Sequence, residues 1–443
     1  MLFLPFIILA FLLQILIITS TNINIYPEFF FYSWMMTKGY LPYRDFVMQH
    51  GLISYLLLAP FSFYKSLIMM KFFYIFVQSI NLILVLLIAR KITNNLGIII
   101  AGIIYIALNF YISDNNLWDE IYATTFFLLT LYLTTAKKIG LTIKLLLMGL
   151  LIGFTTLMKP SFGIMIIPVI LFYRNFLPLI SIILLWALTL LYFFVNNGLY
   201  DFFNNYIFYN KYFITLPKNF WIERGFLNIT IFIFLLSLFF YLFLRNVKKT
   251  AYLDLVVLFS LASLTLFYPG YNKIYLHPFS TFLTIMIAGL IGKINRPFLF
   301  IYLAAVLLFG IFILRKAKNQ FAFINENRIP YIENKKIEQT VNGLKDLPLD
   351  NKKLFVWGNQ IEIYYLLDKP SQIRFPMVVP DSIAYYKSVE DSIIQDLQKN
   401  KIEIIVAAKP LNPYYLSLSK IKKHILTNYR LIKDNQYFQL YSK

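Results

Sequence analysis

Long apolar runs alternate with short polar stretches over the first 314 residues of the chain. A helix needs about 20 apolar residues to cross the roughly 30 Å hydrocarbon core of a bilayer. Runs close to this length predict about eleven membrane crossings. The predicted crossings are residues 1–20, 72–89, 96–112, 118–135, 142–158, 161–173, 178–195, 226–245, 252–268, 277–292 and 297–314.

Two apolar stretches need a separate interpretation. Residues 1–20 lack the basic start and small-residue cleavage site of a signal peptide, so we interpret them as a retained first helix. The stretch Gly51–Tyr64 resembles a half-embedded helix more than a full crossing. If it did cross the membrane, every later crossing would change direction.

The pattern of short strands and turns begins after residue 314. Asp434–Asn435 is a turn signal between two apolar runs, which predicts a terminal hairpin. The predicted strands are Lys353–Trp357, Glu403–Val406, Tyr429–Ile432 and Tyr437–Tyr441, and a helical pattern covers Ser382–Asn400. The sequence therefore predicts an all-α polytopic membrane domain at residues 1–314, followed by a small extracytoplasmic α/β domain at residues 315–443.

Composition supports a membrane protein and argues against a nucleic-acid-binding one. Only 14% of the residues are charged, against about a quarter in soluble proteins, and 59% are hydrophobic. The net charge is +20, but the cations of the first 314 residues stand singly or in pairs between apolar runs. They form no patch that could follow a phosphate backbone. The absence of cysteine excludes disulfides and thiolate metal sites.

The positions of lysine and arginine predict the orientation in the plasma membrane. With the N-terminus in the cytoplasm, each inner connection carries at least one cation. The inner cations are Arg90, Lys91, Lys137, Lys138, Arg174, Arg245, Lys248, Lys249, Lys293 and Arg296. The same assignment places the segments 21–71, 111–119, 196–225 and 268–276 outside, together with the C-terminal domain.

Acidic residues are rare in the membrane part, and two of them lie in the first outer loop. Glu28 follows the first helix, and Asp45 lies in an aromatic, proline-containing segment. An acid beside hydrocarbon is costly and often functional. The alternative is an interfacial carboxylate that points to water.

The second outer loop, Ser113–Tyr122, contains Asp114, Asp119 and Glu120. Together with Glu28 these oxygen ligands could bind a divalent cation across a cavity. Alternatively, they belong to an ordinary solvated loop that caps the next helix, since acids are favoured at a helix N-terminus. The spacing alone does not distinguish the two.

Three cationic candidates face the same side. They are Arg44, Lys159 in a Met-Lys-Pro break between apolar segments, and His277 in a Tyr-Leu-His-Pro segment. A cation at a helix break suits a phosphate group at the membrane surface. The alternatives are a lysine that snorkels to water and a structural histidine.

The order of these segments resembles the polytopic C-type glycosyltransferases, which include protein O-mannosyltransferases and lipid A aminoarabinose transferases. Five pieces stand in family order. They are Glu28, the loop Gly39–Phe46 with His50-Gly51, the segment Gly149–Pro160, the segment Tyr275–Pro278, and Leu354–Gly358 followed by Ile363–Tyr365 and Ser371–Phe375.

This resemblance implies a sugar donor linked to polyprenyl phosphate, an acceptor that is a glycan, lipid or protein, and inverting transfer on the outer face. It implies that Glu28 is the catalytic general base. The substrate-binding residues that it implies are Arg44, Asp45, His50, Asp119, Glu120, Lys159 and His277.

Two departures from the family pattern keep other functions open. The family often has Asp or Asp-Glu where this chain has Pro27-Glu28, and a proline where it has Leu52. One alternative is a catalytically degenerate member that only binds glycans. Another is a transporter or flippase of lipid-linked saccharides, although the sequence lacks the internal repeats typical of transporters.

Overall fold

The computed structural model describes residues 3–23, 25–48, 50–63, 67–215, 224–245, 251–267, 272–294, 296–327, 335–345, 347, 349, 352–378, 380–386, 388–409, 415 and 417–443. It divides into two compact units, each built from segments far apart in the sequence. Unit 1 comprises Met1–Asn24, Lys71–Thr189 and Pro217–Arg328. Unit 2 comprises Ile25–Met70, Leu190–Leu216 and Ile329–Lys443.

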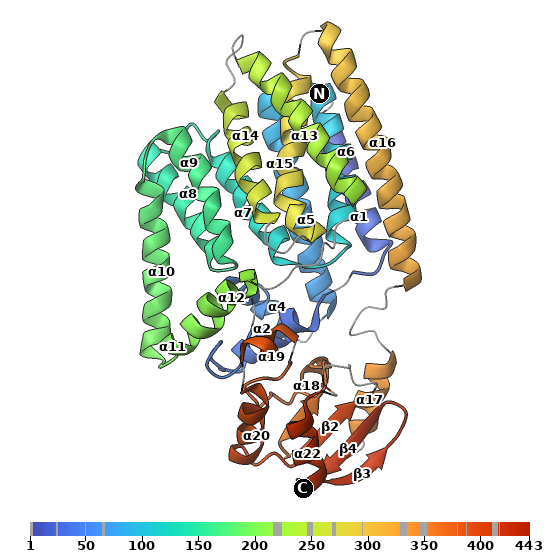
Figure 1. Cartoon of the computed structure of the whole chain (residues 1–443). Helices are drawn as coiled ribbons and strands as arrows, with labels where there is room; N and C mark the ends of the chain where they lie inside the picture. The colour runs from blue at the N-terminus through green and yellow to red at the C-terminus, as the bar shows by residue number, and fades with distance from the viewer. Residues whose placement is uncertain are drawn as a thin grey trace. The chain divides into compact units, whose positions relative to one another are not determined.

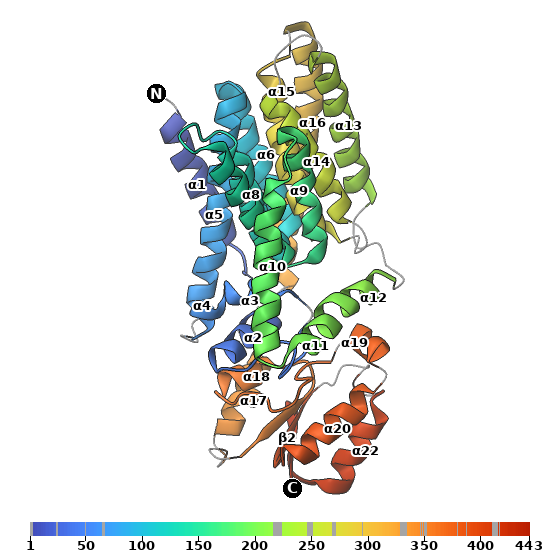
Figure 2. The ribbon, with the colours of Figure 1, turned by 90° about the vertical axis from the view of Figure 1, so that its left-hand side faces the viewer.

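Unit 1 is a bundle of apolar helices (Figures 1 and 2). Its elements are α1 (Phe3–Thr19), α5 (Leu67–Ile92), α6 (Asn95–Ser113), α7 (Asp119–Leu133), α8 (Leu141–Thr156), η1 (Pro160–Met165), α9 (Ile166–Tyr173), α10 (Leu177–Val195), α13 (Arg224–Arg245), α14 (Ala251–Leu264), η3 (Thr265–Phe267), η4 (Lys273–Leu276), α15 (His277–Ile291) and α16 (Arg296–Asn327). Two of them extend into unit 2, because α5 begins and α10 ends there.

Each predicted crossing coincides with one of these helices, or with η1 and α9 together. Among the described residues, six helices are long and apolar enough to cross a bilayer, and α1, α8, η1–α9 and α14 are shorter. The protein is therefore a multi-pass membrane protein. The predicted inner cations Lys248 and Lys249 lie outside the described residues.

Two glycines in α8 allow close helix packing. A Cβ atom on Gly149 would lie 2.0 Å from the backbone oxygen of Pro178, and one on Gly153 would lie 3.1 Å from the side chain of Leu185. Small residues spaced by four are typical of helix pairs in membranes, because they let the backbones approach. The segment around Gly149 thus has a packing role, whatever else it does.

Gly149→Ala should therefore destabilise the protein by about 1–3 kcal/mol, since the helix backbones must separate. Gly310→Ala in α16 is the matched control, because a Cβ atom there meets nothing within 4 Å. Thermal unfolding of both variants in detergent checks this prediction. Equal unfolding temperatures of the two variants would show that α8 and α10 do not pack in this way.

Unit 2 joins the first loop and the segment after α10 to the C-terminal domain. Its elements are α2 (Pro27–Thr37), α3 (Leu52–Leu56), α4 (Ala59–Phe63), α11 (Leu199–Phe202), η2 (Phe203–Phe208), α12 (Tyr209–Thr215), α17 (Lys335–Lys345), β1 (Leu354–Trp357), α18 (Glu362–Leu366), α19 (Pro380–Tyr385), α20 (Val389–Lys399), β2 (Ile404–Ala408), α22 (Ser419–Asn428), β3 (Arg430–Asp434) and β4 (Phe438–Ser442). Residues 51–63 hold two short helices, α3 and α4, where we expected one, and Tyr64 lies outside the described residues. The half-embedded position of this stretch stays a prediction.

Specific contacts hold the first loop and the C-terminal domain together. The Val47 amide donates to the carbonyl oxygen of Arg374 at 2.8 Å. The rings of Phe30 and Trp34 lie 5.0 Å and 5.6 Å from that of Tyr365. These contacts join the first loop and the tail in one folded unit, as expected if both lie on the same side of the membrane.

The tail contains a mixed four-stranded sheet in the order β1-β2-β4-β3 (Figure 1). β1 and β2 are parallel, with Val356 opposite Val406, and β4 pairs antiparallel with both β2 and β3. The predicted strands and terminal hairpin are confirmed. The expected helix at 382–400 is interrupted, since α19 ends at Tyr385 and α20 begins at Val389.

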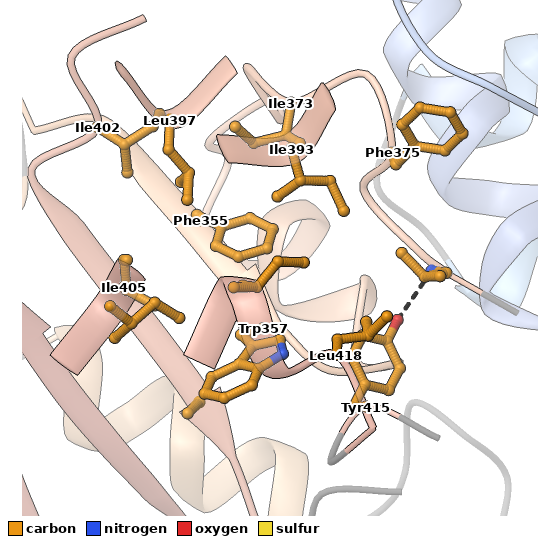
Figure 3. Close-up of a cluster of buried hydrophobic side chains, with 14 of the residues drawn as sticks. Phe355, Trp357, Ile373, Phe375, Ile393, Leu397, Ile402, Ile405, Tyr415 and Leu418 are labelled. Atoms are coloured by element: carbon orange, nitrogen blue, oxygen red, sulfur yellow. Dashed lines mark hydrogen bonds between the residues drawn. The ribbon is translucent and has the colours of Figure 1, made fainter. Parts of the chain in front are cut away.

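Alternate side chains of β1 and β2 reach the core of the tail (Figure 3). Phe355, Trp357 and Ile405 pack there with apolar residues of α20 and α22. The Val378 amide donates to the hydroxyl of Tyr415 at 2.8 Å within this core. Both faces of β1 and β2 are buried, which explains their continuous apolar sequences. The boundary at residue 314 stays a prediction, and α16 continues beyond it to Asn327.

The buried carboxyl group of Glu362 makes the stability of the protein depend on pH. Burial raises the pKa of Glu362 from 4.5 to about 8. Between these values the unfolded chain releases a proton that the folded chain keeps, so stability falls as pH rises from 4.5 to 8. Glu362→Gln should remove this loss. Thermal unfolding of the full-length protein across this range checks the prediction, with Glu338→Gln as the exposed control; an unchanged slope in Glu362→Gln would contradict it.

Candidate active site

The carboxylate of Glu28 lies beside an imidazole in unit 2. Glu28 is in the first turn of α2, directly after Pro27. Proline suits this position because its missing N–H would have no partner there. The Oε1 atom of Glu28 is 3.4 Å from the Nε2 atom of His50, and both side chains are mostly buried, with 12% and 18% exposed. Glu28 is therefore a carboxylate that can take a proton and pass it to the neighbouring imidazole of His50.

Aromatic side chains surround this pair. The ring of Phe29 is 5.1 Å from that of His50, and Tyr55 lies at 6.3 Å. The Tyr43 hydroxyl donates to the carbonyl oxygen of His50 at 3.1 Å. Burial, followed by the charge of Glu28, raises the pKa of Tyr32 above its ordinary value. Tyr32 is therefore a neutral hydroxyl near the carboxylate at physiological pH.

Arg44 and Asp45 tie the same loop to its surroundings. The Arg44 Nε atom lies 2.7 Å from Asp45 Oδ1, and its Nη1 atom donates to the carbonyl oxygen of Asn196 at 2.7 Å. Asp45 also accepts the Leu41 amide at 2.7 Å. These contacts favour a positioning role for both residues. Their predicted role in substrate binding stays a prediction.

A second charged pair lies in unit 1, where α7 begins and α8 ends. Asp119 and Glu120 occupy the first turn of α7 and are buried. The Nζ atom of Lys159 lies 2.9 Å from Glu120 Oε1 and 3.8 Å from the centre of the Tyr275 ring. Asp119 and Glu120 thus lie at a helix start, but they are buried and not in the solvated loop of the alternative interpretation. The Met-Lys-Pro break sets Lys159 at the same end of the bundle.

Asp114 pairs with a lysine that no sequence pattern had singled out. Asp114 follows α6 in a left-handed conformation with φ of 52°, and Lys273 binds its carboxylate. The Nζ atom of Lys273 also lies 4.9 Å from the Tyr111 ring. The sequence feature that could have pointed to Lys273 is its position four residues before His277. Two carboxylate–lysine pairs therefore stand at the end of the bundle where α6 ends and α7 begins.

His277 is fully buried and uses both ring nitrogens. Its Nδ1 atom is 2.9 Å from the Thr124 hydroxyl, and its Nε2 atom is 2.7 Å from Asn109 Oδ1. Asn109 in turn donates to Gln78 Oε1 at 2.9 Å. Polar residues inside the predicted crossings 72–89 and 96–112 could have suggested this network. Its geometry favours the structural role that the sequence left open for His277.

Solved structures of other proteins resemble this chain over nearly its whole length. ArnT from Cupriavidus metallidurans, in the apo state, matches with a TM-score of 0.59 and 10% sequence identity, covering 99% of this chain and 98% of that one. ArnT bound to undecaprenyl phosphate matches with a TM-score of 0.60 and 10% identity, covering 99% and 97%. ArnT is a lipid A aminoarabinose transferase of the C-type glycosyltransferase superfamily. This chain has the C-type glycosyltransferase fold.

A third structure with the C-type glycosyltransferase fold is the oligosaccharyltransferase AglB from Archaeoglobus fulgidus, in complex with an inhibitory peptide and a dolichol-phosphate. It matches with a TM-score of 0.51 and 10% identity, covering 99% of this chain and 74% of that one. No protein-family model and no curated protein sequence matches the chain. The fold expected from the resemblance is thus confirmed by structure.

The divalent-cation site that the sequence suggested for Glu28, Asp114, Asp119 and Glu120 stays a prediction. Within the described ranges, no group of three or more His, Asp or Glu side chains is close enough to hold a metal ion. Asp114 and Glu120 each have a lysine partner, and Glu28 has His50. These pairs make charge neutralisation by lysine the better supported arrangement for Asp114 and Glu120.

Proposed function

We propose that the protein is a membrane glycosyltransferase that moves a sugar from a polyprenyl-phosphate donor to a hydroxyl group of a glycan, lipid or protein. The observation that carries this proposal is the Glu28–His50 pair at 3.4 Å, in a chain that has the C-type glycosyltransferase fold over 99% of its length. The structures of relatives bound to undecaprenyl phosphate and dolichol-phosphate support a donor of this class.

The reaction that we assign is an inverting displacement on the extracytoplasmic side. The acceptor oxygen attacks the anomeric carbon while the bond from that carbon to the phosphate oxygen breaks, and the electron pair leaves with the prenyl phosphate. Glu28 takes the acceptor proton as general base. His50 positions the carboxylate and shares that proton.

Lys159 of unit 1 is the residue that the sequence resemblance implies for the leaving phosphate, and we keep this role as a prediction. A fixed cation can contribute roughly 3 kcal/mol to the stabilisation of such a charge. The side chain of Lys159 is 26% exposed, while its partner Glu120 is 1% exposed, so the ammonium group is the accessible member of the pair. Glu120 and Tyr275 hold the lysine in place.

The position of the charged groups favours catalysis over transport. A transporter of saccharides is expected to have its binding groups near the bilayer midplane. In unit 1, the pairs Asp114–Lys273 and Glu120–Lys159 lie instead at helix ends. We therefore expect that the protein is not a transporter or flippase of lipid-linked saccharides.

The test is donor turnover by purified protein in vesicles that contain a prenyl-phosphate-linked sugar, with extracted glycans or lipids as acceptors. Mass spectrometry should find free prenyl phosphate and a glycosylated acceptor. A parallel sample with EDTA tests the predicted divalent cation. Movement of intact donor between leaflets without release of prenyl phosphate would instead establish a flippase.

A further inference from the structure

An apolar cavity of about 260 Å³ lies within unit 1, between α1, α6 and α16. Its walls include Leu13 of α1, Ala107 and Phe110 of α6, and Leu314 of α16. All these residues lie in the C-terminal halves of their helices. We call this cavity the α1–α6–α16 groove.

The groove opens toward the surroundings of the helix bundle. The side chains of Leu13, Ile103 and Leu314 at its margin are 44%, 45% and 50% exposed. Since these helices are apolar and the protein spans a membrane, the medium at this opening is the hydrocarbon of the bilayer. A hydrocarbon chain can therefore enter sideways.

The groove and the buried polar network use different sides of α6. Ile103, Ile106, Ala107 and Phe110 follow the spacing of one face of α6, and they line the groove. Asn109, which binds His277, lies to one side of this face, roughly 110° around the helix axis from its middle. The groove and the His277 contact thus use different sides of α6.

One cation stands among the apolar walls. Lys318 of α16 lines the groove and is exposed, and no carboxylate among the described residues forms an ion pair with it. It lies one turn beyond Leu314, close to where the apolar part of α16 ends. An apolar slot with a cation at its end is complementary to a hydrocarbon chain that carries an anionic headgroup.

We propose that the α1–α6–α16 groove binds an anionic phospholipid of the bilayer, with an acyl chain in the slot and the phosphate at Lys318. This inference is independent of the proposed glycosyl transfer. It predicts selection by headgroup charge, because a zwitterionic lipid has the same chains but less attraction to the lysine. Each basic residue near a lipid surface changes binding by about fivefold.

The experiment uses the full-length protein in vesicles of phosphatidylcholine that contain a small fraction of lipid with a photoreactive acyl chain. The photoreactive lipid is phosphatidylglycerol in one sample and phosphatidylcholine in the other. Peptide mass spectrometry should find labels on the groove segment Ile103–Phe110, about fivefold more with phosphatidylglycerol. Lys318→Gln should abolish this preference, and Arg315→Gln, the matched exposed cation on α16, should retain it.

A second variant tests the apolar part of the α1–α6–α16 groove. Ala107→Phe fills the groove and should reduce labelling of Ile103–Phe110 by both lipids. Equal labelling by the two lipids, or a preference that survives Lys318→Gln, would overturn the proposal. Displacement of the photoreactive lipid by equimolar undecaprenyl phosphate would overturn it too, since the groove would then belong to a prenyl chain.

Discussion

Glu28→Gln is expected to lower the rate of sugar transfer by about a hundredfold to ten-thousandfold, the usual contribution of a general base. The amide has the size of the carboxylate but cannot accept the acceptor proton. The dissociation constant of the donor should stay unchanged, because Glu28 takes its proton from the acceptor and not from the donor. Single-turnover kinetics with a prenyl-phosphate-linked sugar, together with the dissociation constant of the donor, checks both parts.

Two further variants sharpen this test. His50→Gln should lower the rate less than Glu28→Gln, since it removes the partner and not the base. Glu338→Gln, an exposed acid of α17, is the control and should leave the rate unchanged. Full activity of Glu28→Gln would remove Glu28 from the mechanism and leave the Glu28–His50 pair as a structural contact.

Lys159→Met is expected to have the largest effect on stability. It leaves the carboxylate of Glu120, which is 1% exposed, without its partner. Breaking such a buried pair costs about 3–5 kcal/mol. The double variant Lys159→Met with Glu120→Gln should recover most of this stability but none of the transfer, because the cation for the leaving phosphate is still missing. Thermal unfolding and donor turnover of both variants measure the two effects.

An exposed pair provides the matched control for Lys159→Met. Lys38 and Asp368 lie 3.1 Å apart, with 40% and 50% of their side chains exposed. Lys38→Met should cost less than about 1 kcal/mol, since water screens this pair. If the double variant of Lys159 and Glu120 transferred sugar at the normal rate, Lys159 would be a structural residue and the phosphate would bind elsewhere.

The membrane helices could be predicted because each apolar run is a local signal. The strands of the tail could be predicted for the same reason, as Leu354–Trp357 and Ile404–Ala408 are short apolar runs between polar segments. By contrast, the sequence could not predict that residues 25–70 and 190–216 belong to the same unit as the tail. It depends on contacts such as Val47 with Arg374, which join positions far apart in the sequence.

The candidate site was predictable in its residue types but not in its pairings. The sequence singled out Glu28, His50, Glu120 and Lys159, and the structure joins them as two pairs. It gave no way to choose Lys273 as the partner of Asp114. His277 looked like a cation for phosphate, but its hydrogen bonds to Asn109 and Thr124 are set by packing between helices. The roles of all these residues in catalysis remain predictions.

The fate of the bond between sugar and phosphate tests the central claim most directly. A donor that carries ¹⁸O between the anomeric carbon and phosphorus is incubated with the purified protein and an acceptor. The account predicts that the label remains in the released prenyl phosphate and that release requires the acceptor. Recovery of intact donor, or of the label in the sugar product, would contradict glycosyl transfer by this protein.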